Sequence, residues 1–534
     1  MNMLASEPAS ARAAAGADRS FFGHPRGLGM LFVTEMWERF SYYGMRALLV
    51  LYLVNALKWD KASAANLYGT YTMLVYLTPL IGGYIADRFI GTHRSLLIGG
   101  LIIASGHFVL AFPGMTAFYT GLGLVIIGTG FFKANVSTMV GQLYEKGDTR
   151  RDAGFTFFYM GINTGGFLGP IVCGYFAQSD QFGWHWGFAA AGVGMLAGLL
   201  MYSLGKNKYL AGIGDAPTAV SRAADATEAS IADDASTRNG IIGAVAGAAV
   251  AWFLSGSLLG VLVGTIIGAA LAITILGTQG EERKRVIALF IVAFFVVFFW
   301  AAFEQAGSSM SLFADKFTDL HLGSFAIPST WMQSVNSLFI IIFAPVFAAL
   351  WLALGKRKSE PSTPLKMAIG LTFIGLGFLF LVIGGGRADT GIKVSPLWLI
   401  GAFLFHTFGE LCLSPVGLSY VTRVAPARFA SLMMGVWFLA NAVANKLAGL
   451  LAGYTPLPGE APATLQTGIG GWVQQMSATN HGFFMIFVVT SFIAAVDVAV
   501  RAVAAQTDAD SERVNGHIES GAYHSRRSRV VMAS

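Results

Sequence analysis

The sequence has few of the groups on which soluble enzymes and secreted proteins depend. Only 12% of its 534 residues are charged, and its two cysteines, Cys173 and Cys412, lie inside apolar runs. Two such thiols build neither a disulfide framework nor a thiolate metal site, so we expect them to pack in an apolar interior. The motifs HExxH, GxSxG and GxxxxGK[ST] are also absent. Their absence argues against hydrolysis and ATP-driven pumping, and we expect no enzyme activity.

Apolar residues, by contrast, are abundant. They make up 55% of the chain, and the mean hydropathy is +0.61, which indicates a membrane protein that crosses the bilayer many times. The first 26 residues lack the apolar core of a cleaved signal, so the first span is expected to direct insertion. Apolar stretches long enough to cross a hydrocarbon core of about 30 Å recur along the chain. They predict fourteen membrane-spanning helices, near 28–57, 64–87, 95–112, 115–143, 154–177, 185–204, 240–256, 258–277, 286–312, 328–354, 366–385, 396–421, 429–453 and 481–503.

Twelve of these spans form two sets of six, an arrangement typical of pseudosymmetric transporters. The other two form a charge-free hairpin that follows a polar stretch rich in Ala, Ser, Asp and Thr. We predict an N-terminal arm at 1–27, a six-helix bundle at 28–204, a flexible linker at 205–239, an inserted transmembrane hairpin at 240–277, a second six-helix bundle at 278–503, and a tail at 504–534.

The basic residues predict the orientation in the membrane. Most Lys and Arg residues fall in one set of loops, while the opposite loops hold only Lys58, Lys61, Lys316, Arg387 and Lys393. Basic loops face the cytoplasm in membrane proteins. We therefore expect the arm, the linker, the tail and both termini to be cytoplasmic.

Nine ionisable residues remain inside the predicted spans. They are Glu35, Glu38, Arg39, Arg46, Lys133, Glu304, Glu410, Lys446 and Asp497. A charge that faced lipid at a helix centre would cost about 2.5 to 3.5 kcal/mol. These residues are therefore expected to face a hydrated interior in which acids and bases pair.

Helical spacing predicts which of these charges lie together. Glu35, Glu38, Arg39 and Arg46 recur every three to four residues or at multiples of that spacing, so they share one face of the first span. Arg46 and Glu304 lie at equal depth on two spans that run outward, and we expect them to meet near the outer mouth.

Lys133 and Glu410 lie on two spans that run inward. Their depths differ by about 6 Å at 1.5 Å per residue, a difference that long side chains can absorb. They could form a second pair, nearer the middle or the inner side.

Three motifs on these spans resemble one known family. The first span carries Glu35-Met-Trp-Glu38-Arg39-Phe-Ser-Tyr-Tyr-Gly, the fifth carries FFYMGINTGG, and the tenth carries GELCLSPVGLS. Together they match the ExxERFxYYG and FYxxINxG motifs of the proton-dependent oligopeptide transporters, a family of the major facilitator superfamily. The chain resembles their bacterial members, which carry an extra two-helix hairpin. The resemblance implies two six-helix bundles and import of di- and tripeptides by proton symport.

The resemblance also implies roles for individual residues. The residues implied to couple protons are Glu35, Glu38, Arg39 and Lys133. The peptide-binding residues are Arg39, Tyr42, Tyr43, Tyr76, Lys133, Asn163, Trp300, Glu304, Asn336, Glu410 and Trp437. Within this set Arg39 and Lys133 would take the peptide carboxylate, and Glu304 its amine. The gating pairs are Arg46 with Glu304 and Lys133 with Glu410.

Other readings stay open. The charge cluster at Glu35, Glu38 and Arg39 could have a purely structural role in helix packing. Asn163 could form a hydrogen bond to a neighbouring helix, and we favour structural roles for Lys446 and Asp497. The cargo could be nitrate or another small anionic or amphoteric solute, or the chain could be a peptide receptor that transports nothing. We expect protons as coupling ion, with no cofactor, metal or nucleic acid. We also expect a monomer in the inner (plasma) membrane.

Overall fold

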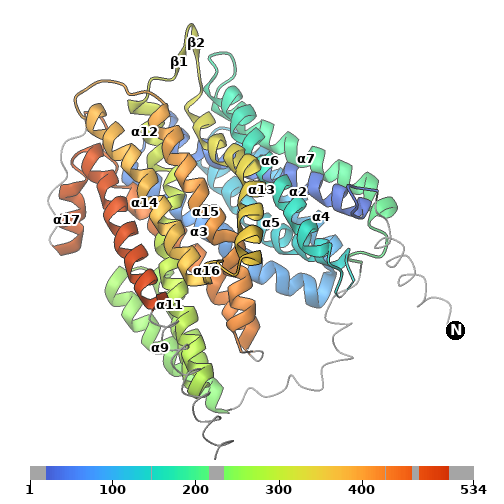
Figure 1. Cartoon of the computed structure of the whole chain (residues 1–534). Coiled ribbons are helices and arrows are strands. Elements are labelled where there is room, and N and C mark those ends of the chain that lie inside the picture. The colour runs from blue at the N-terminus through green and yellow to red at the C-terminus, as the bar shows by residue number, and fades with distance from the viewer. Residues whose placement is uncertain (1–19, 146, 216–233, 427–428, 460–467, 504–534) are drawn as a thin grey trace, which may run out of the picture.

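The chain is almost entirely helical in its computed structural model, with one short β-hairpin (Figure 1). The structure describes residues 20–145, 147–215, 234–426, 429–459 and 468–503. Most of the predicted arm at 1–27, the middle of the predicted linker at 205–239 and the predicted tail at 504–534 lie outside the described residues. The predicted all-α membrane fold is confirmed.

Helices occupy the first six predicted spans and form the first half of the molecule. They are α2 (Arg26–Leu51, continued by a π-helical turn at Tyr52–Ala56), α3 (Lys61–Ile85, continued by a π-helical turn at Ala86–Ile90), α4 (Thr92–Leu110), α5 (Met115–Gln142), α6 (Arg151–Gln178) and α7 (Trp184–Tyr209). At the start of α3, the carboxylate of Asp60 accepts a hydrogen bond of 2.9 Å from the backbone N–H of Ser63. Hydrogen bonding from Ser63 lowers the pKa of this carboxyl group below its usual range.

The second half contains the last six predicted spans. Its elements are α11 (Gly280–Phe303), a 3-10 turn at Glu304–Gly307, α12 (Ser309–Phe317), β1 (His321–Leu322), β2 (Phe325–Ala326), a 3-10 turn at Ser329–Gln333, α13 (Ser334–Lys356), α14 (Thr363–Ala388), α15 (Leu397–Val424), α16 (Ala430–Ala452), the short α17 (Gly468–Met476) and a last helix at Asn480–Val503. β1 and β2 pair antiparallel, with His321 opposite Ala326. The span predicted at 286–312 is thus broken at Glu304, where the α-helix gives way to a tighter turn.

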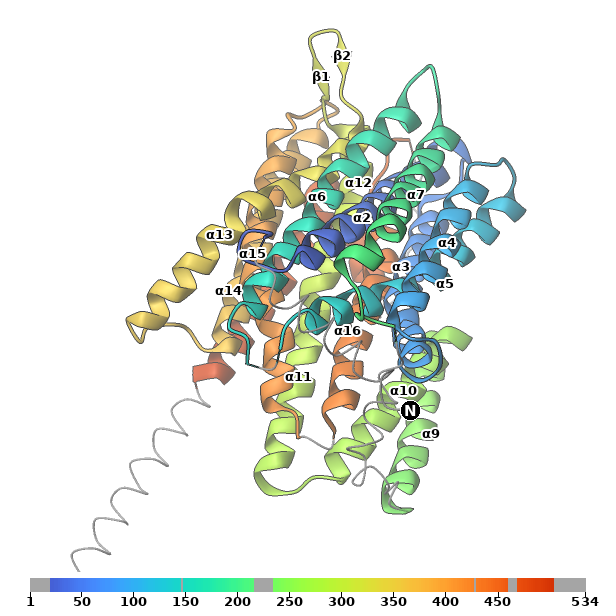
Figure 2. The same ribbon diagram turned by 90° about the vertical axis from the view of Figure 1, so that its right-hand side faces the viewer.

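Nine helices among the described residues are long and apolar enough to cross a membrane by length and composition. Helices also lie at the other predicted positions, including α9 (Asp234–Ser255) and α10 (Leu258–Leu276). Fourteen membrane crossings remain a prediction. α9 and α10 pack on each other and reach the rest of the molecule mainly where α10 contacts α11 and α16, and both views show α9 at the margin (Figures 1 and 2).

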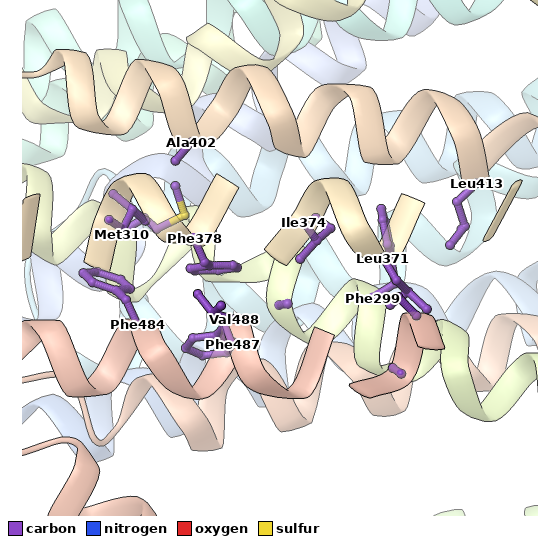
Figure 3. Close-up of a cluster of buried hydrophobic side chains, with 14 of the residues drawn as sticks. Phe299, Met310, Leu371, Ile374, Phe378, Ala402, Leu413, Phe484, Phe487 and Val488 are labelled. Atoms are coloured by element: carbon purple, nitrogen blue, oxygen red, sulfur yellow. The ribbon is translucent and has the colours of Figure 1, made fainter. Parts of the chain in front are cut away.

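Aromatic side chains fill the interior of the second half. Phe378 of α14 stacks on Phe487 of the last helix with ring centroids 4.7 Å apart, and Phe299 and Phe484 belong to the same cluster (Figure 3). Two further clusters lie in the first half, and Leu312 of α12 joins one of them from the second half. Each half therefore has its own apolar core, which allows it to move as a unit.

The two halves are bonded to each other at one end. We call this the closed end; it carries the loops at 57–60, 179–183 and 318–328, and the β1 and β2 hairpin stands there at the top of Figure 2. The opposite end carries the basic loops, and we call it the basic end. Hydrogen bonds between the halves run from the closed end inward to Tyr159 and Glu410. They join Arg46 to Glu304, Asn55 to Asp315 and Lys316, Gln178 to Ser329 and Thr330, Trp331 and Thr330 to α6 carbonyls, Gln333 to Ala47, Ser334 to Phe167, Lys446 to Asn66 and Thr70, and Tyr159 to Glu410.

Two glycines bring α3 and α16 into close contact at the closed end. A Cβ added to Gly449 would lie 2.5 Å from the carbonyl oxygen of Ala65 and 2.6 Å from the Cα of Gly69. A Cβ on Gly69 would meet Gly449 in turn. Only glycine permits this approach of two backbones, a device common between membrane helices.

Gly449→Ala is expected to separate α3 from α16 and destabilise the protein by about 1 to 3 kcal/mol, the usual effect of overpacking. The melting temperature in detergent checks this. Gly435→Ala is the matched control, because it lies on the same helix and its added Cβ would meet nothing within 4 Å. Equal melting temperatures for the two variants would contradict the packing argument.

Candidate functional site: a cavity between the two halves

A cavity of about 280 Å³ lies between the halves, close to the lower end of the range for small-molecule sites, about 300 Å³. It is lined from both sides by charged, amide and aromatic side chains. Predicted site residues on its wall are Glu35, Arg39, Tyr43, Arg46, Tyr76, Lys133, Asn163, Trp300, Glu304, Asn336, Glu410 and Trp437. A buried wall of this composition suits a small ligand that carries charge.

One face of α2 holds a buried cluster of charges. The Nε atom of Arg39 lies 3.0 Å from a carboxylate oxygen of Glu35 and also pairs with Glu38. Arg39 is 3% exposed and Glu38 is 0% exposed, so the cluster is shielded from solvent. The helical spacing that predicts one shared face is the cause, since α2 is regular over Arg26–Leu51. Two carboxylates therefore compete for one guanidinium group.

Lys133 enters the cavity from α5 without an acidic partner at its side chain. Its Nζ lies 3.8 Å from the ring centroid of Tyr76 on α3, a cation–π contact. Among the described residues it forms no ion pair. This lysine is therefore the cation in the cavity that is available to an anionic ligand group.

Arg46 and Glu304 form an ion pair that joins α2 to the break after α11. Both side chains are buried, and the Nε of Arg46 also donates to the Tyr68 hydroxyl at 2.6 Å. The 3-10 turn at Glu304–Gly307 places this carboxylate where the helix axis is interrupted. The pair lines the cavity on the side of the closed end.

Glu410 enters the cavity from α15 and is held by neutral groups. The Tyr159 hydroxyl donates to its Oε1 at 3.1 Å, and the Asn336 amide donates to its Oε2 at 3.4 Å. Asn336 also donates to the Thr407 hydroxyl at 3.0 Å. The predicted pair between Lys133 and Glu410 is not formed among the described residues in this conformation.

Comparison with known proteins assigns the chain to a family. The sequence model of the POT family matches residues 93–466. The chain belongs to the POT family. It is 42% identical to the uncharacterized transporter YclF of Bacillus subtilis, over 85% of this chain and 92% of that protein. It is 38% identical to the peptide transporter YePEPT of Yersinia enterocolitica, over 82% and 89%.

Solved structures of POT-family transporters resemble this chain over nearly its whole length. A crystal structure of peptide transporter POT in complex with sulfate has a TM-score of 0.73 and 36% identity, and the match covers 92% of this chain and 98% of that one. A POT family transporter in complex with 5-aminolevulinic acid gives a TM-score of 0.72 and 31% identity, with coverage of 91% and 97%. The predicted major facilitator fold is therefore confirmed for this POT-family chain.

Some predicted residues lie away from the cavity wall of this POT-family protein. Glu38 does not line the cavity and forms an ion pair with Arg39. The Tyr42 ring also lies outside the lining, with its centroid 5.2 Å from the Cζ of Arg39. Asn163 lines the cavity but donates to the Tyr159 carbonyl of its own helix at 2.9 Å, not to a neighbouring helix. An asparagine in a helix can donate its side-chain N–H to a carbonyl of its own helix, so this hydrogen bond needs no second helix.

Two charges inside the predicted spans take no part in the cavity. Lys446 bonds to the Asn66 side chain and lies 2.7 Å from the Thr70 hydroxyl, across the contact of α16 with α3. Asp497 pairs with Arg501 on the last helix at 2.6 Å. Both arrangements fit the structural roles that the sequence favours.

The cavity wall also contains residues that sequence reasoning missed. Tyr159, His406 and Asn441 line it and carry polar groups. Tyr159 lies within the FFYMGINTGG motif, which was a usable signal, whereas His406 and Asn441 have none beyond their place in apolar helices. The described residues contain no group of three His, Cys, Asp or Glu side chains that could hold a metal ion.

Proposed function

We propose that this POT-family protein imports di- and tripeptides in symport with protons. The observation that carries the proposal is a buried cavity with Lys133 on one wall and Glu410 on the other, neither of which is ion-paired within the described part of the chain. A zwitterionic peptide presents a carboxylate and an ammonium group separated by two or three residues at about 3.3 to 3.6 Å each. A relative from Lactococcus lactis that is 36% identical is named a di-/tripeptide transporter.

The charges of the cavity divide into two poles. Arg39 and Lys133 are proposed to hold the peptide carboxylate, where the fork of Arg39 suits two oxygens. Glu304 is proposed to accept the peptide amine, and Glu410 adds negative charge to the same pole. Asn336 and Asn163 offer amide groups to the peptide backbone, and Trp300, Trp437, Tyr43 and Tyr76 offer aromatic area to varied side chains. The 5-aminolevulinic acid of the solved relative also carries an amine and a carboxylate.

Proton coupling is proposed to act through Arg39. Glu35 and Glu38 both bind this guanidinium group in the structure. When one carboxylate takes a proton, its attraction for Arg39 falls, and Arg39 becomes available to the peptide. Proton and peptide binding are thereby linked. The two halves then rock between states, and the Arg46 and Glu304 pair stabilises the state that is sealed at the closed end.

The basic end is proposed to face the cytoplasm, because basic loops are retained there. The protein would then lie in the inner membrane with both termini inside. We propose that it acts as a monomer and not as an enzyme, with protons as its coupling ion and no other cofactor.

Uptake into proteoliposomes tests this function. Purified protein in vesicles with an acidic exterior is expected to accumulate a labelled dipeptide, and dissipating the pH gradient with a protonophore should stop accumulation. N-acetylated and C-amidated forms of the same dipeptide are matched controls that each remove one charge. Binding without uptake would indicate a receptor, and gradient-driven uptake of nitrate instead of peptide would overturn the assignment of cargo.

Lys133→Met should reduce proton-driven dipeptide uptake by at least about tenfold, because a charge-assisted hydrogen bond contributes about 1.5 to 3 kcal/mol. The loss should be smaller for the C-amidated dipeptide, which has no carboxylate to bind. Lys208→Met is the control, since Lys208 is exposed at the basic end of α7. An equal loss for both forms of the peptide would contradict carboxylate recognition by Lys133.

A further inference from the structure

Tyr159 lies in the FFYMGINTGG segment of α6 and has no role among the binding groups proposed above. Its hydroxyl donates to Glu410 of the other half at 3.1 Å, while Asn336 donates to the second carboxylate oxygen. One donor thus comes from the first half and one from the second. Together they hold the Glu410 carboxylate in place.

This hydrogen bond is the last of a row along α6. From the closed end inward, α6 contacts the second half through Gln178, the Ile171 carbonyl, the Phe167 carbonyl and finally Tyr159. Among the described residues, this is the hydrogen bond between α6 and the second half that lies nearest the basic end. Tyr159 therefore marks the inner end of the hydrogen-bonded row along α6.

Lys133 faces the same cavity from the first half. It rests on the Tyr76 ring and forms no ion pair among the residues that the structure describes. Glu410 meanwhile is satisfied by two neutral donors. A base and an acid thus line one cavity without binding each other, although an ion pair between them would be the stronger contact if the halves approached.

We propose that Tyr159 is a positioning residue that competes with Lys133 for Glu410. In the conformation seen here, the Tyr159 hydroxyl holds Glu410, and Lys133 has no ion pair among the described residues. When the basic end closes, Glu410 exchanges the hydroxyl for Lys133, and the row of contacts along α6 opens from the other side. This inference rests on the proposed function only in assuming that the two halves rock.

Distance measurements between spin labels test the competition without any substrate. Ala153→Cys on α6 and Ala353→Cys on α13 place labels on exposed sites near the basic ends of the two halves, and the native Cys173 and Cys412 are buried. Tyr159→Phe is expected to raise the ratio of short to long label distances by roughly tenfold, the effect of one charge-assisted hydrogen bond. An unchanged ratio would overturn the proposal.

Tyr175→Phe is the matched control, because Tyr175 lies on α6, is exposed and does not line the cavity. It should leave the distances unchanged, and an equal shift there would also overturn the proposal. The Lys133→Met background separates competition from simple packing. Without the competing lysine, Tyr159→Phe should shift the ratio by less than about twofold. A full tenfold shift in that background would show that Lys133 is not the competitor.

Glu410→Gln provides an independent variant should Tyr159→Phe fail to fold. Glutamine still accepts the Tyr159 hydrogen bond but cannot form an ion pair with Lys133. The short distances should therefore become rarer, the opposite of the effect of Tyr159→Phe. More frequent short distances would refute the exchange. These readouts are conformational, so failure of peptide uptake would refute the proposed function and leave this inference to its own test.

Discussion

Glu38→Gln is expected to abolish proton-driven accumulation of dipeptide while exchange of labelled for unlabelled peptide continues. Glu38 is completely buried, and its carboxylate pairs with Arg39. Glutamine keeps the size of the side chain but can neither take up the proton nor hold Arg39 by charge. An imposed gradient of about one pH unit supports about tenfold accumulation for one proton per peptide, since one unit is worth 1.36 kcal/mol. In the variant this ratio should fall to that of passive equilibration.

Two assays on the same vesicles check this result. Uphill uptake measures coupling, and counterflow measures the movement of the binding site across the membrane. Glu281→Gln is the control, because Glu281 is exposed at the start of α11, where it pairs with Lys284 three residues later on the same helix. Retained accumulation in Glu38→Gln would refute the coupling role. Loss of counterflow as well would point to a packing role for the cluster around Arg39.

The fold could be predicted from the sequence because the membrane leaves few choices. Backbone groups in hydrocarbon must be satisfied within their own helix, so every long apolar stretch predicts a helix. The helices observed at the fourteen predicted positions reflect this. The break at Glu304 could not be predicted in the same way. The helix changes there to a 3-10 turn at Glu304–Gly307, and apolar composition does not distinguish an α-helix from a 3-10 turn.

The sequence predicted those features of the site that depend on the spacing of residues within one helix. Three charges at helical spacing had to share a face of α2, and the structure pairs Arg39 with Glu35 and Glu38. Contacts between helices depend in addition on the conformational state. Equal depth brings Arg46 and Glu304 together at the closed end, whereas Glu410 is bonded to Tyr159 in this conformation and is not paired with Lys133.

Glu304→Leu is expected to destabilise the protein by about 3 to 5 kcal/mol, because it leaves the buried guanidinium group of Arg46 without its partner. Arg46→Met should cost a similar amount by stranding the carboxylate of Glu304. Thermal unfolding in detergent measures both. Uphill dipeptide uptake should also be lost in each single variant, since the pair is proposed to stabilise the state sealed at the closed end and Glu304 is the proposed acceptor of the peptide amine.

The double variant Arg46→Met with Glu304→Leu separates stability from function. A buried ion pair replaced by apolar groups of similar volume is often neutral or even stabilising, so the melting temperature should return to near that of the parent protein. Uptake should stay absent, because an apolar contact neither responds to a peptide amine nor releases when one binds. Recovery of uptake together with stability would show that the pair only packs the closed end. A melting temperature as low as in the single variants would show that the surrounding groups, among them the Tyr68 hydroxyl bonded to Arg46, depend on the charges themselves.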